Sequence, residues 1–126
     1  MSASELCKFT IAELGEKIAA KDVSPVEVTD AHLEQIDALN PKLNAFITVA
    51  HDRARAEAKE SEAEIAAGKI RGPLHGIPIG VKDIIDSANV RTTQGPSFFS
   101  NNVPDKDAEC VRRFRDAGAI MIGKCN

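Results

Sequence analysis

The sequence predicts an α/β protein with a helical first half, followed by strand, loop, helix and strand. Two short apolar runs, residues 77–81 and 119–122, are typical of buried strands, and a helix is expected between them over about residues 107–117. A strand, a helix and a second strand joined by a long connection favour parallel pairing, because parallel strands need a crossover. We therefore expect a sheet with helices packed against it.

Two capping boxes mark the first helices. The pattern T-x-x-E over Thr10–Glu13 predicts a helix that continues to about residue 20. The pattern S-P-V-E begins a second helix at Ser24, with Pro25 in the first helical position, where its missing N–H costs little. This helix is expected to end at Asn40–Pro41, because proline disfavours helical backbone in the residue before it.

The next segments are assigned by composition. Residues 50–67 are rich in Ala, Glu, Lys and Arg, which predicts a third helix that Gly68 ends. The run A-F-I-T-V-A over 45–50 is expected to be a strand or an extended bridge. Residues 89–105 are rich in turn formers and predict a long loop.

A single lysine lies in an otherwise apolar segment, G-P-L-H-G-I-P-I-G-V-K-D, residues 72–83. Strand alternation places one set of side chains on the core face: Ile77, Ile79 and Val81. Pro78, Gly80 and Lys82 then share the other face, where the small residues leave room for another segment to approach. A partly desolvated lysine there can be neutral near pH 7 and act as a general base. The alternative is a strand-end lysine that reaches solvent and pairs with Asp83.

This segment, with R-T-T-Q-G and V-P-D-K-D-A-E-C-V-R-R-F-R-D-A-G-A-I-M-I-G-K-C-N, resembles the N-terminal portion of the amidase signature family. The likeness runs from the helix near Thr10 to Asn126. It implies the N-terminal part of the amidase-signature fold, a mixed β-sheet flanked by helices, with residues 1–126 as an incomplete part of a single domain. Family members are serine hydrolases that cleave amide bonds through a Ser-Ser-Lys triad. The resemblance implies that Lys82 deprotonates a bridging serine, which in turn activates the nucleophilic serine.

The sequence departs from the family at two places. The family carries its two triad serines in a Gly/Ser-rich segment downstream of the G-K-[TC]-N motif, beyond the residues present here. Three other serines, Ser87, Ser97 and Ser100, lie in no such segment. Cys125 replaces the usual threonine and is expected to weaken a neighbouring hydrogen bond, since a thiol is a poor donor. The 126-residue chain alone is therefore expected to be inactive.

Three functions stay open on the sequence. The first is hydrolysis of a small-molecule carboxylic amide through a serine acyl-enzyme, in a longer protein, with Lys82 as the base. The second is a non-catalytic truncated fragment, or a piece whose fold is completed by self-association or by a partner chain. The third is the amidase subunit of a tRNA-dependent amidotransferase, which shares the same N-terminal pattern.

Composition disfavours several other classes. The net charge of −3 and the absence of Trp and Tyr argue against nucleic-acid binding. No apolar window approaches the ~18 residues of a membrane helix, and no signal peptide is expected. Three widely spaced cysteines fit a reducing compartment, so we expect a cytoplasmic protein.

No cofactor or metal is expected. Residues 118–125, G-A-I-M-I-G-K-C, match a P-loop only in spacing, because Ala-Ile-Met-Ile favours a strand and the Mg²⁺-binding hydroxyl is absent. The three histidines have no partner at metal-ligand spacing. His75 is expected to be a turn histidine held by backbone, with a pocket wall as the alternative. The hydroxyls of Thr92 and Thr93 are expected to hold a loop in shape.

Overall fold

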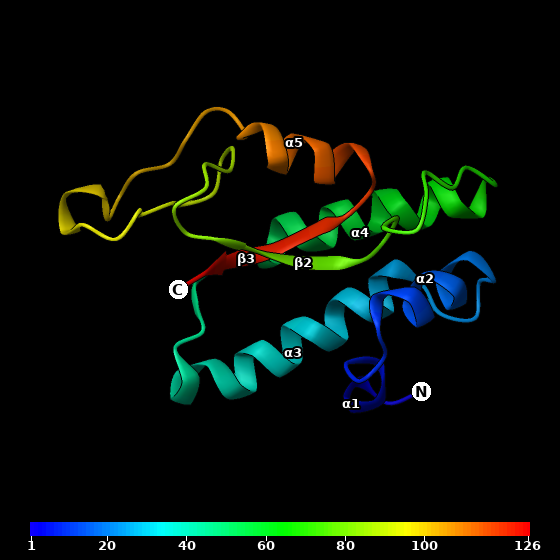
Figure 1. Cartoon of the computed structure of the whole chain (residues 1–126). Helices are drawn as coiled ribbons and strands as arrows, with labels where there is room; N and C mark the ends of the chain where they lie inside the picture. Colours follow the sequence, from blue (N-terminus) through cyan, green and yellow to red (C-terminus); the bar gives the residue numbers. More distant parts are fainter.

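The computed structural model describes all 126 residues and has a small mixed sheet with helices on both faces (Figure 1). The helices are α1 (Ala3–Leu6), α2 (Ile11–Ala19), α3 (Pro25–Leu43), α4 (His51–Ala66) and α5 (Glu109–Asp116). The strands are β1 (Phe46–Val49), β2 (Pro78–Lys82) and β3 (Ile120–Cys125), and a 3₁₀ turn, η1 (Ser97–Phe99), lies in the long loop. The predicted α/β class and the helical first half are thus confirmed.

β3 is the central strand, in the order β1-β3-β2. It pairs in parallel with β2, as the strand–helix–strand pattern predicted, and antiparallel with β1. The sheet is therefore mixed. In the β2–β3 pairing Ile79 faces Met121 but Gly80 faces Gly123, so Ile122 is an extra residue in a bulge. The bulge changes which face of the sheet the later side chains of β3 point to.

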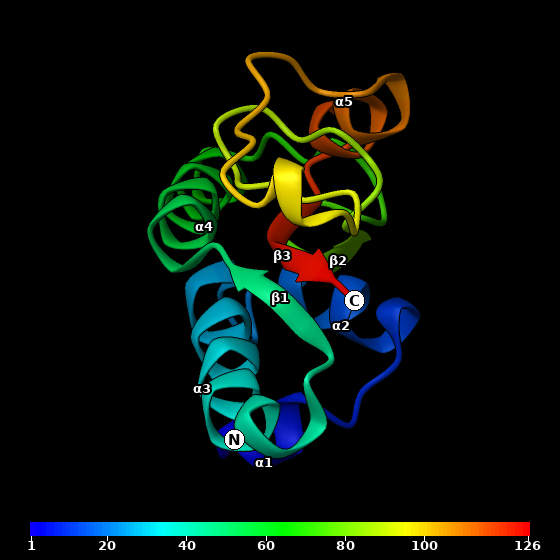
Figure 2. The same ribbon diagram turned by 90° about the vertical axis from the view of Figure 1, so that its left-hand side faces the viewer.

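Helices α3 and α4 cover one face of the sheet, and the two views place α5 on the other (Figures 1 and 2). The first interface is a cluster of Leu33, Ala54, Ala58, Ile120 and Ile122. The small alanines of α4 let this helix pack closely on β3, as its narrow apolar stripe indicated. The opposite interface is a cluster of Val81, Val90, Val111 and Met121, which joins α5 and the loop after β2 to the sheet.

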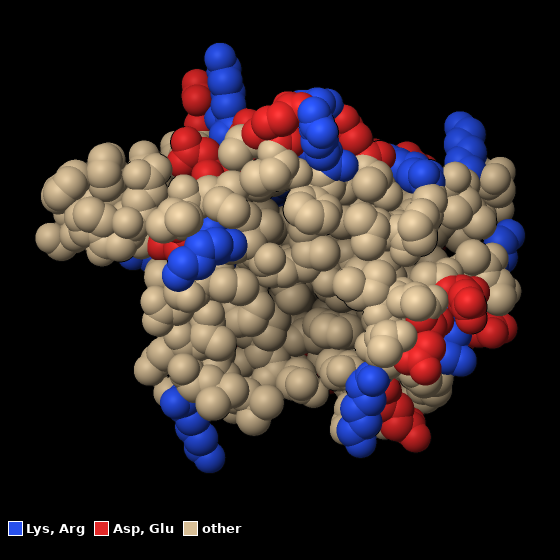
Figure 3. All heavy atoms as spheres, in the orientation of Figure 1, with Lys and Arg blue, Asp and Glu red and all other residues tan.

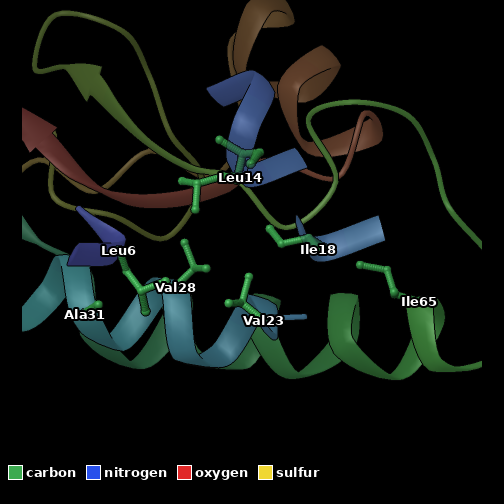
Figure 4. Close-up of a cluster of buried hydrophobic side chains, with 8 residues drawn as sticks. Leu6, Leu14, Ile18, Val23, Val28, Ala31 and Ile65 are labelled. Carbon is green, nitrogen blue, oxygen red and sulfur yellow. The ribbon is translucent and has the colours of Figure 1, made fainter. Parts of the chain in front are cut away.

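A third cluster joins the N-terminal helices to the end of α4 (Figure 4). It contains Leu6, Leu14, Ile18, Val23, Val28, Ala31, Ile65 and Ile77. Ile77 therefore packs with the helices, whereas Ile79 and Val81 pack under α5. The prediction that all three share one face is wrong, because Ile77 precedes the strand and follows the turn at Gly76.

The helix starts follow the sequence, and one helix end does not. Capping boxes at Thr10 and Ser24 begin α2 and α3 as predicted, and a third at Ser2 begins α1, which the prediction omitted. The predicted end of α3 at Asn40–Pro41 is wrong, because the helix includes Pro41 and ends at Leu43. In the last turn proline removes only one backbone hydrogen bond, and Asn44 closes the helix with a left-handed backbone.

Candidate functional site

Lys82 is the last residue of β2, an edge strand, and its partner in the register is Cys125 of β3. Its side chain is exposed, which differs from the partial desolvation expected from the sequence. The difference arises because no segment of these 126 residues covers the end of the strand. The space-filling view shows a hollow near the middle of the visible face (Figure 3). Lys82 is thus accessible from solvent.

The face that Lys82 shares with Gly80 is closely packed. A Cβ added to Gly80 would lie 2.6 Å from Cys125 Sγ and 3.4 Å from Phe46 Cε1. A Cβ on Gly123 would lie 2.5 Å from the Thr48 carbonyl oxygen and 2.9 Å from Phe46 Cδ1. The absence of side chains at Gly80 and Gly123, on adjacent strands, therefore lets the ring of Phe46 pack against the sheet. This agrees with the expectation that the small residues of this face leave room for another segment.

Cys125 belongs to the surroundings of Lys82. Burial raises the pKa of the Cys125 thiol, and the positive charges of Lys82 and Lys124 oppose this shift. All three cysteines of the chain are free, so Cys125 is a thiol in this structure. Lys82 and Cys125 therefore lie side by side at the polar end of the β2–β3 pair.

Asp83 closes the loop that follows Lys82. It is buried and accepts hydrogen bonds from the backbone N–H of Thr93, at 3.1 Å, and from the Thr93 hydroxyl. Its own N–H donates to the Cys125 carbonyl at 2.9 Å, and its carbonyl accepts from Gln94 N–H at 3.1 Å. Both ends of residues 83–94 are thereby tied to the end of the sheet. The threonine pair was expected to hold a loop in shape, and this is confirmed.

Lys124 occupies the interior of the same loop and is fully buried. Its ammonium donates to the Ile85 carbonyl, to Ser87 Oγ at 2.9 Å and to Thr92 Oγ1 at 3.0 Å. Burial lowers the pKa of Lys124, while the carboxylates of Asp83 and Asp86 oppose this shift.

In the sequence, Lys124 stands out only as part of a mismatched P-loop. Residues 120–125 indeed form a strand, as expected from Ala-Ile-Met-Ile. Nothing local in the sequence marks Lys124 as buried, because its partners lie 32 to 39 positions away. The bulge in β3 turns it toward the loop rather than toward α3 and α4.

Ser87 and Lys124 form the buried serine–lysine pair of this structure, and it is closed to substrate. Both side chains are 0% exposed, so an amide carbonyl cannot reach Ser87 Oγ. Ser97 and Ser100 lie at η1, in a loop that projects from the body of the molecule (Figure 1). None of these serines lies in a glycine-rich segment. Lys82 remains the exposed lysine of the site.

The chain contains no group of three or more His, Cys, Asp or Glu side chains arranged to hold a metal ion. None of its helices combines the length and apolarity needed to cross a membrane.

Comparison with known sequences places this geometry in context. A family model described as Amidase matches residues 27–126. A glutamyl-tRNA(Gln) amidotransferase subunit of Geobacter sp. (strain M21) is 43% identical over 122 residues, 97% of this chain. The corresponding protein of Granulibacter bethesdensis is 44% identical over 98% of this chain. The alignments span 25% and 24% of those relatives, so the chain corresponds to about a quarter of their length.

Solved structures give the same family of folds. Native peptide amidase from Stenotrophomonas maltophilia aligns over 94% of this chain and 25% of its own, with a TM-score of 0.89 and 40% identity. A fatty acid amide hydrolase aligns over 99% of this chain and 22% of its own, with a TM-score of 0.92 and 25% identity. The chain therefore corresponds to about a quarter of the length of each of these structures.

Proposed function

Because the chain belongs to the amidase family, we propose that it supplies the lysine base of an amide hydrolase, with Lys82 in that role. The observation that carries the proposal is the position of Lys82. It ends β2 in the segment that resembles the family motif, and its side chain is exposed. The other lysine near this end of the sheet is Lys124 of β3. It is enclosed by the loop of residues 85–92, so a substrate cannot reach it.

The proposed chemistry uses Lys82 in its neutral form. Lys82 Nζ takes a proton from a bridging serine, which takes the proton of a second serine as that hydroxyl attacks the amide carbonyl. The C–N bond then breaks, the amine leaves with a proton, and an acyl-enzyme forms that water hydrolyses to the acid. Both serines would come from a part of the domain beyond these residues. Residues 1–126 would then be the N-terminal part of one amidase domain.

The amidase subunit of a tRNA-dependent amidotransferase is the second candidate. The observation in its favour is that relatives at 42 to 44% identity are named as subunits of glutamyl-tRNA(Gln) amidotransferase. In that role the complete protein would work with partner subunits and pass ammonia onward, whereas a free amidase would release it. A non-catalytic piece that needs a partner chain or a second copy is the third candidate. A cytoplasmic location, supported by the cysteine pattern, is part of the proposal.

A chimera tests the role of Lys82. The present chain replaces the matching quarter of the Stenotrophomonas maltophilia peptide amidase, to which it is 40% identical. We expect the chimera to hydrolyse a peptide amide and the Lys82→Ala variant to lose about 10³-fold or more in kcat, as when a triad base is removed. Stopped-flow measurement of the acyl-enzyme burst should give no burst in the variant.

The matched control is Lys106→Ala, which removes an exposed lysine from the loop before α5. This variant should keep the activity of the parent chimera. Retained turnover and a normal burst in Lys82→Ala would exclude Lys82 as the base.

A further inference from the structure

The ammonium of Lys124 has a complete set of partners inside the loop that follows Lys82. An ammonium has three N–H donors, and three oxygen atoms accept from it. These are the carbonyl of Ile85 and the hydroxyls of Ser87 and Thr92. All three acceptors lie between residues 85 and 92, so one buried charge organises the whole loop.

The hydroxyl groups are oriented to accept from Lys124. Ser87 Oγ donates to the Ile85 carbonyl at 3.3 Å, and Thr92 Oγ1 donates to the Val90 carbonyl at 3.1 Å. Their protons are therefore committed to backbone carbonyls, and only their lone pairs face Nζ. A neutral amine would present its own lone pair with no proton to meet it, so this arrangement selects the charged form.

A short chain of hydrogen bonds joins this ammonium to Lys82. Ile85 N–H donates to the Lys82 carbonyl at 3.0 Å, which closes a turn directly after β2. The carbonyl of the same Ile85 accepts from Lys124 Nζ. Lys124 thus holds the far end of the turn whose near end is Lys82. Asp83 holds the middle of that turn through Thr93 and Cys125.

We propose that Lys124 is a positioning residue: its buried ammonium fixes the turn after β2 and so sets the backbone from which Lys82 extends. The inference rests on the proposed function, in which Lys82 is the base. This role explains why the loop encloses a lysine rather than an apolar side chain of the same length. Without that cation, the oxygens of residues 85, 87 and 92 would be buried with fewer partners.

The test reads the hydrogen bond from Ile85 N–H to the Lys82 carbonyl rather than turnover, so its failure can be distinguished from a failure of the proposed function. The 126-residue chain is labelled with ¹⁵N, and lysine ammonium signals and amide exchange are recorded near neutral pH. We expect one ammonium signal protected from solvent exchange, absent in Lys124→Met and present in the exposed-lysine control Lys106→Met. We also expect exchange of Ile85 N–H to rise about tenfold in Lys124→Met.

Two further measurements separate positioning from general stability. Amides in the core of α3, at Val28 and Leu33, should exchange within about twofold of the parent rate in Lys124→Met. Thr92→Val keeps the shape of the side chain but removes one acceptor. It should speed both ammonium exchange and Ile85 exchange by about threefold, and it serves if Lys124→Met does not fold. An unprotected Lys124 signal, an unchanged Ile85 rate, or an equal rise at all amides would overturn the proposal.

Discussion

At the scale of single residues, two lysines near the end of one parallel strand pair have opposite environments. Lys82 ends the edge strand β2 and is exposed, whereas Lys124 lies in the central strand β3 and is fully buried. A buried lysine is tolerated only where its donors are satisfied, and the loop of residues 85–92 provides three oxygens. The chemistry proposed for this site therefore falls to the lysine that a substrate can reach.

Gly80 gives a prediction about the packing beside Lys82. Gly80→Ala should lower the free energy of unfolding by about 1–3 kcal/mol, because the new methyl group would overlap Cys125 Sγ. Removing that sulfur in Cys125→Ala should relieve much of the overlap. Urea unfolding of the two single variants and the double variant gives the coupling energy. Simple additivity of the two changes would show that Gly80 and Cys125 do not compete for space.

His75 gives a prediction about pH. It is 2% exposed, its Nδ1 accepts from the Arg71 N–H at 3.1 Å, and its Nε2 lies 3.1 Å from Glu64 Oε2 without a well-aligned hydrogen bond. The expected backbone-held turn histidine is thus confirmed. Burial lowers the pKa of His75 below its ordinary value of 6.5, and Glu64 partly opposes this.

The unfolded chain therefore takes up a proton at His75 before the folded chain does. The contribution of neutral His75 to the free energy of unfolding is complete above about pH 6.5. It falls as the pH drops from there through the folded-state pKa of His75. His75→Gln should flatten this part of the stability curve, measured as the urea midpoint against pH. At about pH 8, where the imidazole is neutral in both states, any difference between the proteins reports packing alone. Equal slopes below about pH 6.5 would rule out His75 as the source.

At the scale of elements, local hydrogen bonds decide where the N-terminal helices begin. Each of the first three helices starts with a capping box that satisfies otherwise free N–H groups. These signals lie within four residues of sequence, which is why the sequence alone predicts the starts of α2 and α3. The end of α3 also depends on a longer contact, because the Asn40 side chain binds both backbone groups of Phe46 at the start of β1.

Ser24 gives a prediction at this scale. Its hydroxyl accepts from Glu27 N–H at 3.1 Å, and Glu27 Oε2 accepts from the Ser24 N–H at 2.8 Å. Ser24→Ala should cost about 1 kcal/mol of stability, the usual loss for an N-cap serine. Ser4→Ala, at an exposed position inside α1, is the matched control and should change stability little. A thermal melt that shows equal shifts for both variants would contradict the capping role.

At the scale of the whole molecule, the sheet has an open edge at each side and the surface carries large apolar side chains. Phe98 is 78% exposed in the projecting loop, Leu43 65% at the end of α3, and Ile84 62% after β2. Figure 3 shows no charged side chain on the visible face of that loop, while charges gather over the helices. The chain spans about a quarter of the length of the relatives it matches.

The isolated chain gives the corresponding prediction. It should not hydrolyse a peptide amide at any detectable rate, because none of its loop serines, Ser87, Ser97 and Ser100, lies in a Gly/Ser-rich segment of the kind that carries the triad serines of the family. Mass-spectrometric detection of the acid product, with the peptide amidase chimera as the positive control, measures this directly. Size-exclusion chromatography on the same samples identifies the active species. Turnover that elutes with the monomer would contradict both the prediction and the proposed origin of the serines.

The sequence by itself determined the α/β class, the starts of α2 and α3, the parallel pairing of β2 with β3, and the family through the segment around Lys82. Those features depend on hydrophobic period, on caps a few residues long, and on a motif carried by consecutive residues. Each is therefore written within one stretch of chain.

The tertiary structure alone decided the environments of the two lysines and the extension of α3 through Pro41. Strand alternation cannot place Lys124, because the bulge at Ile122 changes the face to which the later residues of β3 point. Its acceptors come from a loop more than thirty positions away and meet it only when β2 and β3 pair. Burial depends on such contacts between distant segments. The motif alone therefore cannot tell which of the two lysines is buried, and the fold decides it.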